Sequence, residues 1–178
     1  KVGWLTLHAG MAGGADIILL PEIPYDINIV ADAIKKRSRA GKRFSILAVA
    51  EGAISKENAA LSKKELKKLQ QNNPYPSIAY EIGARINELT GQEVRVTVPG
   101  HMQRGGAPCP YDRVLSTRLG AAAGEMIMDG KFGYLVGIKN NEITKVPLSD
   151  VAGKLKMVSP DCDMIKEAKL VGISFGDE

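Results

Sequence analysis

The stretch Ala15-Asp16-Ile17-Ile18-Leu19-Leu20-Pro21 decides the fold. Its four consecutive large apolar residues leave no polar face, which is typical of a strand buried on both sides in a parallel sheet. Pro21 stops the run, because proline cannot donate the backbone hydrogen bond that a central strand requires. A second apolar run over 44–50 predicts another buried strand.

Helical patterns surround these two runs. Apolar residues at helical spacing predict helices over 5–12, 26–40 and 78–89, the last closed by Gly91. Val94, Val96 and Val98 alternate with polar residues and predict a third strand over 93–99. Strands that alternate with helices favour an α/β fold, a three-layer sandwich with a mainly parallel sheet.

The remaining part of the chain predicts a loop, a helix and a pair of strands. A Gly- and Pro-rich loop over 100–111 precedes a helix over 112–128, with Asp112 expected as its N-cap. Strands are predicted on both sides of the turn Asn140-Asn141. Ser62 and Glu65 have the spacing of a capping box for a short basic helix. No linker separates two domains, so we expect one domain over 1–178.

Composition excludes several classes of protein. With 44% hydrophobic and 25% charged residues, the chain has the composition of a globular domain, and no run is long enough to span a membrane. Two cysteines in unrelated contexts, Cys109 and Cys162, favour a reducing cytoplasm over a disulfide framework. The only histidines, His8 and His101, cannot form a multi-histidine site, so we predict no metal site in this chain.

The net charge of +4 is concentrated locally, mainly in the basic cluster over 35–43. Cations in the last turn of a helix complement the helix dipole, which is the simplest interpretation of this cluster. An anionic small ligand is a second interpretation and nucleic acid a third. Only 5% of residues are aromatic, which leaves few stacking platforms for bases.

Chemically active residues follow the predicted third strand. His101 and Arg104 lie in a segment with Gly100, Gly105 and Gly106, where the backbone can approach a ligand closely. Arg104 offers a planar fork that matches phosphate, and His101 offers a second donor. A simple turn with a surface salt bridge would use the same residues, so this pattern alone leaves both interpretations open.

Two further candidates are Glu51 and Arg95. Glu51 directly follows the second buried run, where a carboxylate can accept hydrogen bonds from sugar hydroxyls, ligate a metal, or simply be solvated. Arg95 lies on the polar face of the third strand and could form an intrachain salt bridge or reach a ligand across a subunit boundary. The sequence lacks the common nucleotide-binding glycine motifs and hydrolase triads. We therefore expect it to supply the residues of only half an active site.

These residues carry a resemblance to a known family. The run Arg95-Val-Thr-Val-Pro-Gly100-His101-Met-Gln103-Arg104-Gly105-Gly106, followed by Asp112-Arg113, resembles the signature of the 6-phosphofructokinases. Blocks around Gly13-Gly14-Ala15-Asp16, Ala50-Glu51-Gly52 and Lys139-Asn140-Asn141 resemble further blocks of that family. The resemblance extends over roughly residues 3–146.

The resemblance implies an activity and roles for the candidate residues. It implies transfer of a phosphoryl group to the 1-hydroxyl of fructose 6-phosphate in glycolysis, with Mg²⁺ and with ATP or pyrophosphate as donor. It implies that Glu51 binds sugar hydroxyls, that His101 and Arg104 bind fructose 6-phosphate, and that Arg95 reaches the 6-phosphate from a neighbouring subunit. Arg104 would also support the transition state.

The resemblance also implies what lies outside the chain. The chain is similar to the carboxy-terminal, sugar-phosphate-binding domain, so we expect the phosphate-donor domain and the catalytic base upstream. We expect the chain alone to be inactive, and the enzyme to be a cytoplasmic homo-oligomer, a dimer or a tetramer. Lys42 and Arg43 fall where compact bacterial members bind a regulatory nucleotide, although Phe44 replaces the polar residue usual there.

Two other functions are compatible with the sequence. A non-catalytic sugar-phosphate-binding regulatory subunit would keep the same fold without turnover. A nucleic-acid-binding module based on the basic cluster 35–43 would show affinity that falls steeply with salt. We expect no nucleic-acid or membrane partner.

Overall fold

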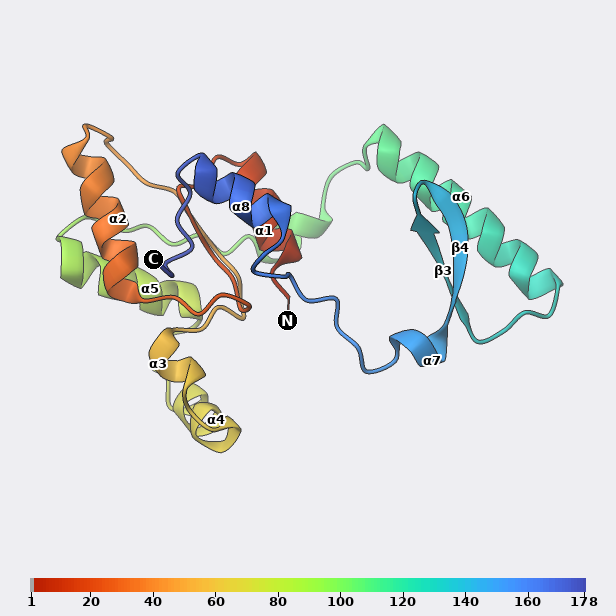
Figure 1. Ribbon diagram of the computed structural model, residues 1–178, viewed down its shortest axis with the longest axis horizontal. Helices are drawn as coiled ribbons and strands as arrows, with labels where there is room; N and C mark the ends of the chain where they lie inside the picture. The colour runs from red at the N-terminus through yellow and green to blue at the C-terminus, as the bar shows by residue number, and fades with distance from the viewer. Residues whose placement is uncertain (1) are drawn as a thin grey trace. The chain divides into compact units, whose positions relative to one another are not determined.

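The computed structural model describes residues 2–178, apart from the side chain of Gln70. The chain forms two compact units, which are described separately below (Figure 1). Unit 1 comprises Lys1–Thr97 and Lys156–Glu178, and unit 2 comprises Val98–Leu155.

A small parallel sheet forms the centre of unit 1. Its strands β1 (Ile17–Leu19) and β2 (Leu47–Val49) pair in register, with Ile18 opposite Ala48. Ser174 adds a parallel bridge to Ile17 on the other edge of β1. The two apolar runs therefore form the buried parallel pair that the sequence predicts.

Helices cover both faces of this pair, because successive side chains of β1 point to opposite sides. Ile17 and Leu19 pack toward α2 (Ile27–Arg39) and α5 (Ile78–Thr90). Ile18 and Leu20 pack toward α1 (Trp4–Ala12) and α8 (Asp163–Leu170). Figure 1 shows the two helical layers on either side of the strands, which confirms the α/β three-layer arrangement.

Gly10 explains how closely α1 approaches the sheet. A Cβ atom added there would lie 2.8 Å from Cδ1 of Ile18 and 3.1 Å from Cβ of Ala48. The helix therefore packs directly against both strands, at a distance that only glycine permits.

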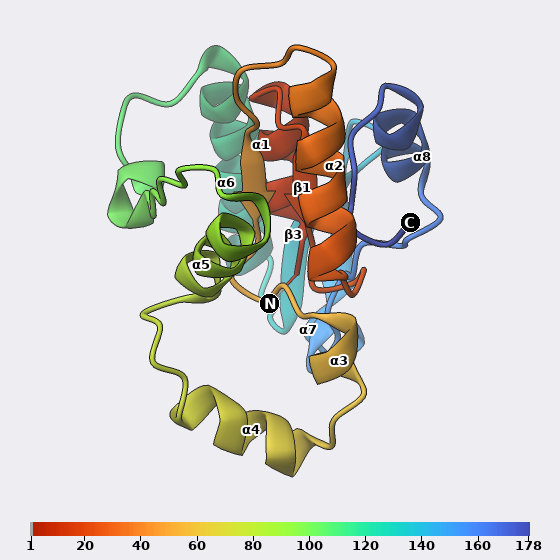
Figure 2. The same cartoon turned by 90° about the vertical axis from the view of Figure 1, so that its left-hand side faces the viewer.

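Local signals define the outer helices of unit 1. Asp26 caps α2, because its Oδ1 accepts a hydrogen bond from the backbone N–H of Asn28 at 2.8 Å. The predicted capping box is confirmed at α4 (Lys63–Gln71), where the carboxylate of Glu65 accepts from the backbone N–H of Ser62 at 3.0 Å. Together with the short α3 (Lys56–Ala59), α4 forms an excursion away from the layers (Figure 2).

The prediction of a third strand over 93–99 is wrong. Residues 93–98 belong to no helix or strand, Pro99 has the right-handed helical conformation at the start of η1, and among the described residues this segment pairs with no neighbouring strand. The alternation of side chains is nevertheless present, since Val94 and Val96 are half-buried while Glu93 and Arg95 are exposed. The alternation of apolar and polar residues shows which face of the segment is buried. A strand also requires a neighbouring strand as its hydrogen-bonding partner.

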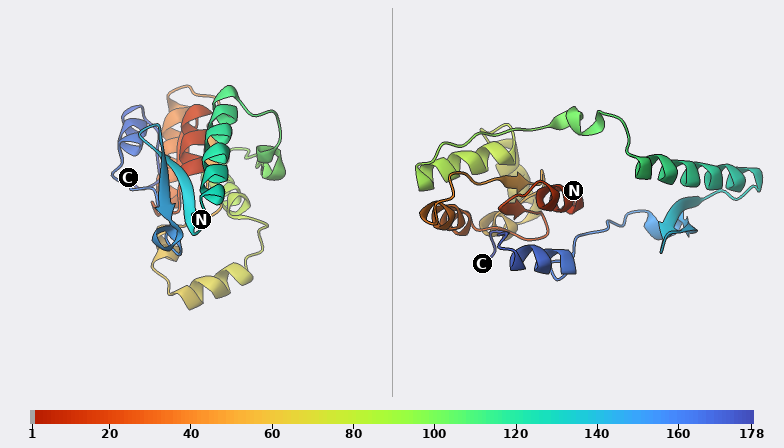
Figure 3. Two further views of the ribbon diagram at one scale, coloured as in Figure 1. Left: turned by 90° about the vertical axis from the view of Figure 1, so that its right-hand side faces the viewer. Right: turned by 90° about the horizontal axis from the view of Figure 1, so that it is seen from above.

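Unit 2 consists of a long helix and a hairpin. Strands β3 (Tyr134–Lys139) and β4 (Glu142–Pro147) pair antiparallel, as predicted, with Asn140 and Asn141 between them at φ 51° and 63°. Left-handed conformations at both positions are those of the tight turn that matches strand twist. Figure 3 shows α6 (Pro110–Met128) beside this hairpin, and the single turn α7 (Leu148–Val151) follows β4.

The predicted start of α6 is also corrected. The helix begins at Pro110 with Cys109 as its N-cap, and not with Asp112. Proline fits the first helical position because its missing N–H would have no partner there. Asp112 instead accepts a hydrogen bond from Sγ of Cys109 at 3.2 Å. Gly100–Arg104, expected within a loop, forms the short 3₁₀ helix η1.

None of the helices in the part of the chain that the structure describes is long and apolar enough to cross a membrane.

Candidate functional site

Glu22 and Glu51 follow the carboxyl ends of the two parallel strands, and their side chains have different surroundings. Glu22, three residues beyond β1, accepts hydrogen bonds at its Oε1 from the backbone N–H groups of Gly3 at 3.0 Å and Val158 at 3.1 Å. Glu22 therefore joins the start of the chain to its last segment. Glu51, in the turn after β2, has an exposed side chain. Of the two, Glu51 is placed where a ligand at this edge can reach it.

Arg95 lies in the segment that follows α5. Its Nε donates to Oε1 of Glu93 at 2.9 Å, and both side chains are largely exposed, at 86% and 76%. An ion pair this exposed contributes at most about 1 kcal/mol, so it does not commit Arg95 to Glu93. The intrachain salt bridge considered from the sequence is therefore present, while the guanidinium stays accessible to an anion.

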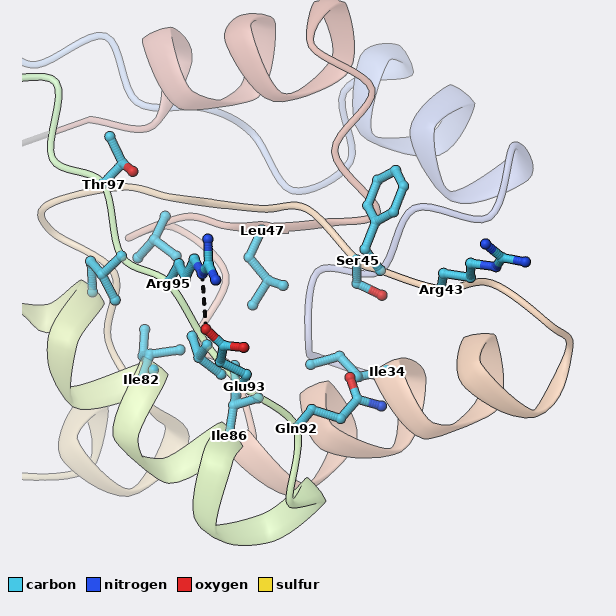
Figure 4. Close-up of a pocket in the computed structure, with 16 residues that line it drawn as sticks. Ile34, Arg43, Ser45, Leu47, Ile82, Ile86, Gln92, Glu93, Arg95 and Thr97 are labelled. Carbon is cyan, nitrogen blue, oxygen red and sulfur yellow. Dashed lines mark hydrogen bonds and ion pairs between the residues drawn. The ribbon is translucent and has the colours of Figure 1, made fainter.

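Arg95 is one of the residues around a pocket of about 540 Å³ within unit 1. One long side of this pocket is formed by residues of 43–49 and the opposite side by residues 92–97, with α5 beneath (Figure 4). The apolar residues that line the pocket include Ile34, Leu47 and Ile82. Sequence reasoning did not anticipate this pocket, because it depends on how far residues 92–97 lie from β2.

Lys42 and Arg43, the residues expected at an effector site, lie at the end of the turn after α2. Both are exposed, and Arg43 also lines the pocket. The exposed side chain of Phe44 follows them. The structure brings Arg43 and Arg95 to the rim of one pocket, which the sequence did not indicate.

The basic cluster at the end of α2 has a partner that the sequence did not reveal. Arg37 forms an ion pair with Asp16 at 2.8 Å and donates from its Nε to Oγ of Ser45 at 3.1 Å. Oδ2 of Asp16 in turn accepts from the backbone N–H of Ile46 at 2.9 Å. Part of the cluster therefore braces the entry into β1 and β2, in addition to complementing the helix dipole.

His101 and Arg104 lie on η1 in unit 2, and both are exposed. A 3₁₀ helix has three residues per turn, so side chains three apart lie on the same side. Within residues 2–178 neither side chain makes a hydrogen bond or ion pair. Two neighbouring side chains with hydrogen-bond donors, one of them a guanidinium, are thus available to an anionic ligand.

Across the described residues, no group of three or more His, Cys, Asp or Glu side chains is arranged to hold a metal ion. Mg²⁺ is commonly held by one or two carboxylates together with phosphate oxygens, so it does not depend on such a group.

Comparisons with known proteins show the family of the chain. A family model described as "Phosphofructokinase" matches residues 1–127. The chain is 50% identical over 177 residues to an ATP-dependent 6-phosphofructokinase of Spirochaeta thermophila, covering 99% of this chain and 48% of that protein. It is 44% identical over 176 residues to an ATP-dependent 6-phosphofructokinase of Chloroflexus aurantiacus, with the same coverage. The chain therefore spans about half the length of these curated relatives.

Solved structures give the same result. The phosphofructokinase of Pichia pastoris in the T-state matches with a TM-score of 0.62 and 33% identity, over 83% of this chain and 16% of that one. The pyrophosphate-dependent phosphofructokinase of Nitrosospira multiformis matches with a TM-score of 0.72 over 99% of this chain and 46% of that one. At 18% identity, the second match supports the fold alone. Because the family model matches most of its length, the chain belongs to the phosphofructokinase family.

Proposed function

We propose that this chain supplies the fructose 6-phosphate-binding half of an ATP-dependent 6-phosphofructokinase, a glycolytic phosphotransferase. The observation that carries this proposal is the exposed pair His101 and Arg104 on one side of η1, without a carboxylate partner among the described residues. The pair stands within the segment that resembles the family signature. The names of relatives that are 50% and 44% identical support the same activity.

ATP is the donor that the comparisons favour. Relatives that share 39–50% identity with the chain are named ATP-dependent. The pyrophosphate-dependent structures share only 18–19% identity, which carries fold similarity and no donor preference. We therefore propose ATP, bound mainly by the half of the enzyme that lies outside this chain.

In the proposed reaction, the 1-hydroxyl oxygen of fructose 6-phosphate forms a bond to the γ-phosphorus of ATP. The bond from that phosphorus to the β–γ bridging oxygen breaks, and ADP leaves. The hydroxyl proton passes to a base that we expect upstream of this chain. Mg²⁺ would accompany the nucleotide, held by groups outside residues 2–178.

The residues of this chain bind and orient the sugar phosphate. Glu51 accepts hydrogen bonds from sugar hydroxyls, while Arg95 binds the 6-phosphate and His101 contacts the sugar phosphate. Arg104 lies nearest the transferred group, where a guanidinium stabilises charge on the phosphoryl oxygens. Phosphoryl transfer depends chiefly on positioning and charge, which these four side chains can supply.

The proposal extends to assembly and regulation. The enzyme is a cytoplasmic homo-oligomer of two or four subunits, in which Arg95 serves the site of a neighbouring subunit. Lys42 and Arg43 are the positions where an anionic effector would bind. An effector that acts there would lose its influence in Lys42→Ala, while turnover without effector would stay unchanged.

Steady-state kinetics of a subunit of the relatives' length that contains this chain test the proposal. Arg104→Ala should lower kcat/KM for fructose 6-phosphate by about 100-fold or more, because it removes a donor aimed at developing charge. Glu51→Gln should raise the KM for the sugar phosphate while leaving the KM for ATP unchanged.

Arg118→Ala is the matched control, because it removes the same charge from unit 2 but lies in α6, where its Nη1 donates to Oδ1 of Asn141 in the hairpin turn at 3.0 Å. Equal losses in Arg104→Ala and Arg118→Ala would contradict the assigned role. Sugar-phosphate binding without any turnover in the longer subunit would favour the non-catalytic regulatory subunit instead.

A further inference from the structure

The excursion of residues 56–77 has no part in the proposed reaction or at the effector positions. Its helix α4 stands apart from the helices that cover the sheet (Figure 2). Leu66 is half-buried, whereas Leu69 and Tyr75 are exposed. The excursion therefore has apolar surface that the rest of unit 1 leaves uncovered.

One face of α4 consists of lysine side chains. Each residue of an α-helix is rotated by about 100° from the one before, so positions 63, 64, 67 and 68 fall within about 140° of the circumference. The residues there are exposed and make no hydrogen bond or ion pair with any residue that the structure describes: Lys63, Lys64, Lys67 and Lys68. The carboxylate of Glu65 in the same helix instead accepts from the backbone N–H of Ser62 at 3.0 Å. These four residues, the lysine face, therefore present positive charge that no described carboxylate pairs with.

A groove adjoins the lysine face. It has a volume of about 500 Å³, and Lys68 of that face is among its lining residues. Its apolar lining comes from Leu69, Pro74 and Tyr75. A groove of this size accommodates a large apolar side chain. Positive charge and apolar surface therefore lie side by side.

Two carboxylates restrict what can enter the groove. Glu65 and Glu81 are among its lining residues. Each already accepts a hydrogen bond, Glu65 from Ser62 and Glu81 from Nδ2 of Asn73 at 2.7 Å. Because their negative charge opposes the entry of a phosphate or a carboxylate, the groove favours an uncharged side chain. Anionic groups favour the lysine face beside it.

The excursion that carries the groove is fastened at both ends. Before α3, Ser55 forms a parallel bridge with Tyr25, which is buried in unit 1. After α4, the hydrogen bond from Asn73 to Glu81 joins the turn to α5, and Oδ1 of Asn73 accepts from the backbone N–H of Tyr75 at 2.9 Å. A preformed site loses less conformational entropy when a partner binds.

We propose that the lysine face and the groove form a docking site for an acidic segment of another protein. Carboxylates of the partner pair with the lysines, and an apolar side chain next to them enters the groove beside Leu69 and Tyr75. The unpaired positive charge selects a negatively charged partner, while the carboxylates of the groove disfavour phosphate groups of nucleic acids or lipids. The proposal is independent of whether the chain binds fructose 6-phosphate.

Two synthetic heptapeptides test this site by NMR titration of the 178-residue chain. One peptide has a central Phe with three Glu residues on each side, and the other has Ala in place of the Phe. At about 50 mM salt, the Phe peptide should bind with a Kd below about 1 mM and should shift the amides of Leu69, Asn73 and Tyr75. The Ala peptide should bind at least about threefold more weakly, because it has no large apolar side chain for the groove.

Variants separate the lysine face from the net charge of the chain. Glutamine at all four positions of the lysine face should weaken binding of the Phe peptide at least about tenfold. Leu69→Ser should reduce the affinity for the Phe peptide to that for the Ala peptide. The matched control removes four charges from the end of α2 and should change the Kd by less than about twofold. Its substitutions are Lys35→Gln, Lys36→Gln, Arg39→Gln and Lys42→Gln.

Several results would overturn the proposal. These are no shift of the α4 amides by the Phe peptide, equal affinity for the two peptides, or equal losses in the two fourfold variants. Tighter binding of a short DNA duplex or of phosphatidylserine vesicles to the same lysines would assign the face to nucleic acid or membrane instead. Shifts of the α4 amides that depend on chain concentration without peptide would assign it to a second copy of the chain. The two peptides are compared on the unaltered chain, so that result stands even if a variant fails to fold.

Discussion

The two units of the chain bury their apolar residues very differently. In unit 1, Leu7, Ile18, Leu19 and Phe175 are fully buried around the sheet. Among the described residues of unit 2, Met126 alone is a buried apolar residue. Other apolar residues of this unit, such as Ile127, Phe132 and Leu135, are exposed. Unit 1 therefore has its own core, whereas unit 2 is held mainly by hydrogen bonds of the hairpin and by its contacts with α6.

This difference bears on each proposed residue by itself, because each stands on one unit or the other. Glu51 and Arg95 stand on the packed scaffold of unit 1, while His101 and Arg104 stand on a short exposed helix of unit 2. Side chains on packed elements are positioned more precisely than side chains on thinly supported ones. We expect stability effects to concentrate in unit 1, and the following variants test that contrast.

Truncation of a core leucine should show the largest contrast. Leu19→Ala removes a fully buried side chain of β1 and should lower the free energy of unfolding by about 2–5 kcal/mol. The matched change Leu135→Ala affects a side chain of β3 that is 48% exposed and should cost less than about 1 kcal/mol. Urea denaturation measures both, and similar losses would refute the contrast.

Alkaline pH should destabilise unit 1 through Tyr25. Burial, with the negative charges of Glu81 and Glu57 adding and Arg85 opposing, raises the pKa of Tyr25 to about 12. The unfolded phenol ionises near 10, so the stabilisation is complete below pH 10 and lost as the pH rises to 12, by about 2–3 kcal/mol. Denaturation at several pH values measures this loss, and Tyr25→Phe should remove it. A loss unchanged in Tyr25→Phe would assign it to other groups.

Glycines inside helices should respond with opposite signs in the two units. Gly10→Ala would place a Cβ 2.8 Å from Cδ1 of Ile18 and should cost about 1–3 kcal/mol. Gly124→Ala in α6 meets no atom within 4 Å and should instead stabilise its helix by up to about 1 kcal/mol. Thermal unfolding followed by circular dichroism compares them. Destabilisation by Gly124→Ala would contradict the open surroundings of this residue.

Helix caps should give the smallest contrast. Asp26→Ala removes the side-chain acceptor at the start of α2 and should cost about 1 kcal/mol. Asp112→Ala lies inside α6, beyond its N-cap Cys109, and should cost less than about 0.5 kcal/mol. The same denaturation experiment measures both variants. An equal loss of stability in the two variants would indicate that Asp112 caps α6.

Local signals were sufficient for much of the fold. The apolar run ending at Leu20 predicted a strand buried on both faces, and the structure places its side chains in two separate helical layers. The capping box of Ser62 and the glycine stop at Gly91 were also correct, since both depend on residues within one turn.

Features that depend on distant residues were not accessible from the sequence. Val94 and Val96 revealed a buried face, but nothing local shows whether a strand partner lies close enough to pair. Arg37 was interpreted through its own helix, while its partner Asp16 lies in another element. The division into two units also has no local signal in the sequence, because unit 1 is formed by two segments, the second of which begins at Lys156.

The most direct test of the central claim is a phosphoryl-transfer assay with ATP and fructose 6-phosphate. It compares the 178-residue chain with a subunit of the relatives' length that contains it, and identifies the product by ³¹P NMR. The expected result is phosphorylation at the 1-hydroxyl by the longer subunit and none by the 178-residue chain. Turnover by the 178-residue chain alone, or no transfer to fructose 6-phosphate by the longer subunit, would contradict the claim.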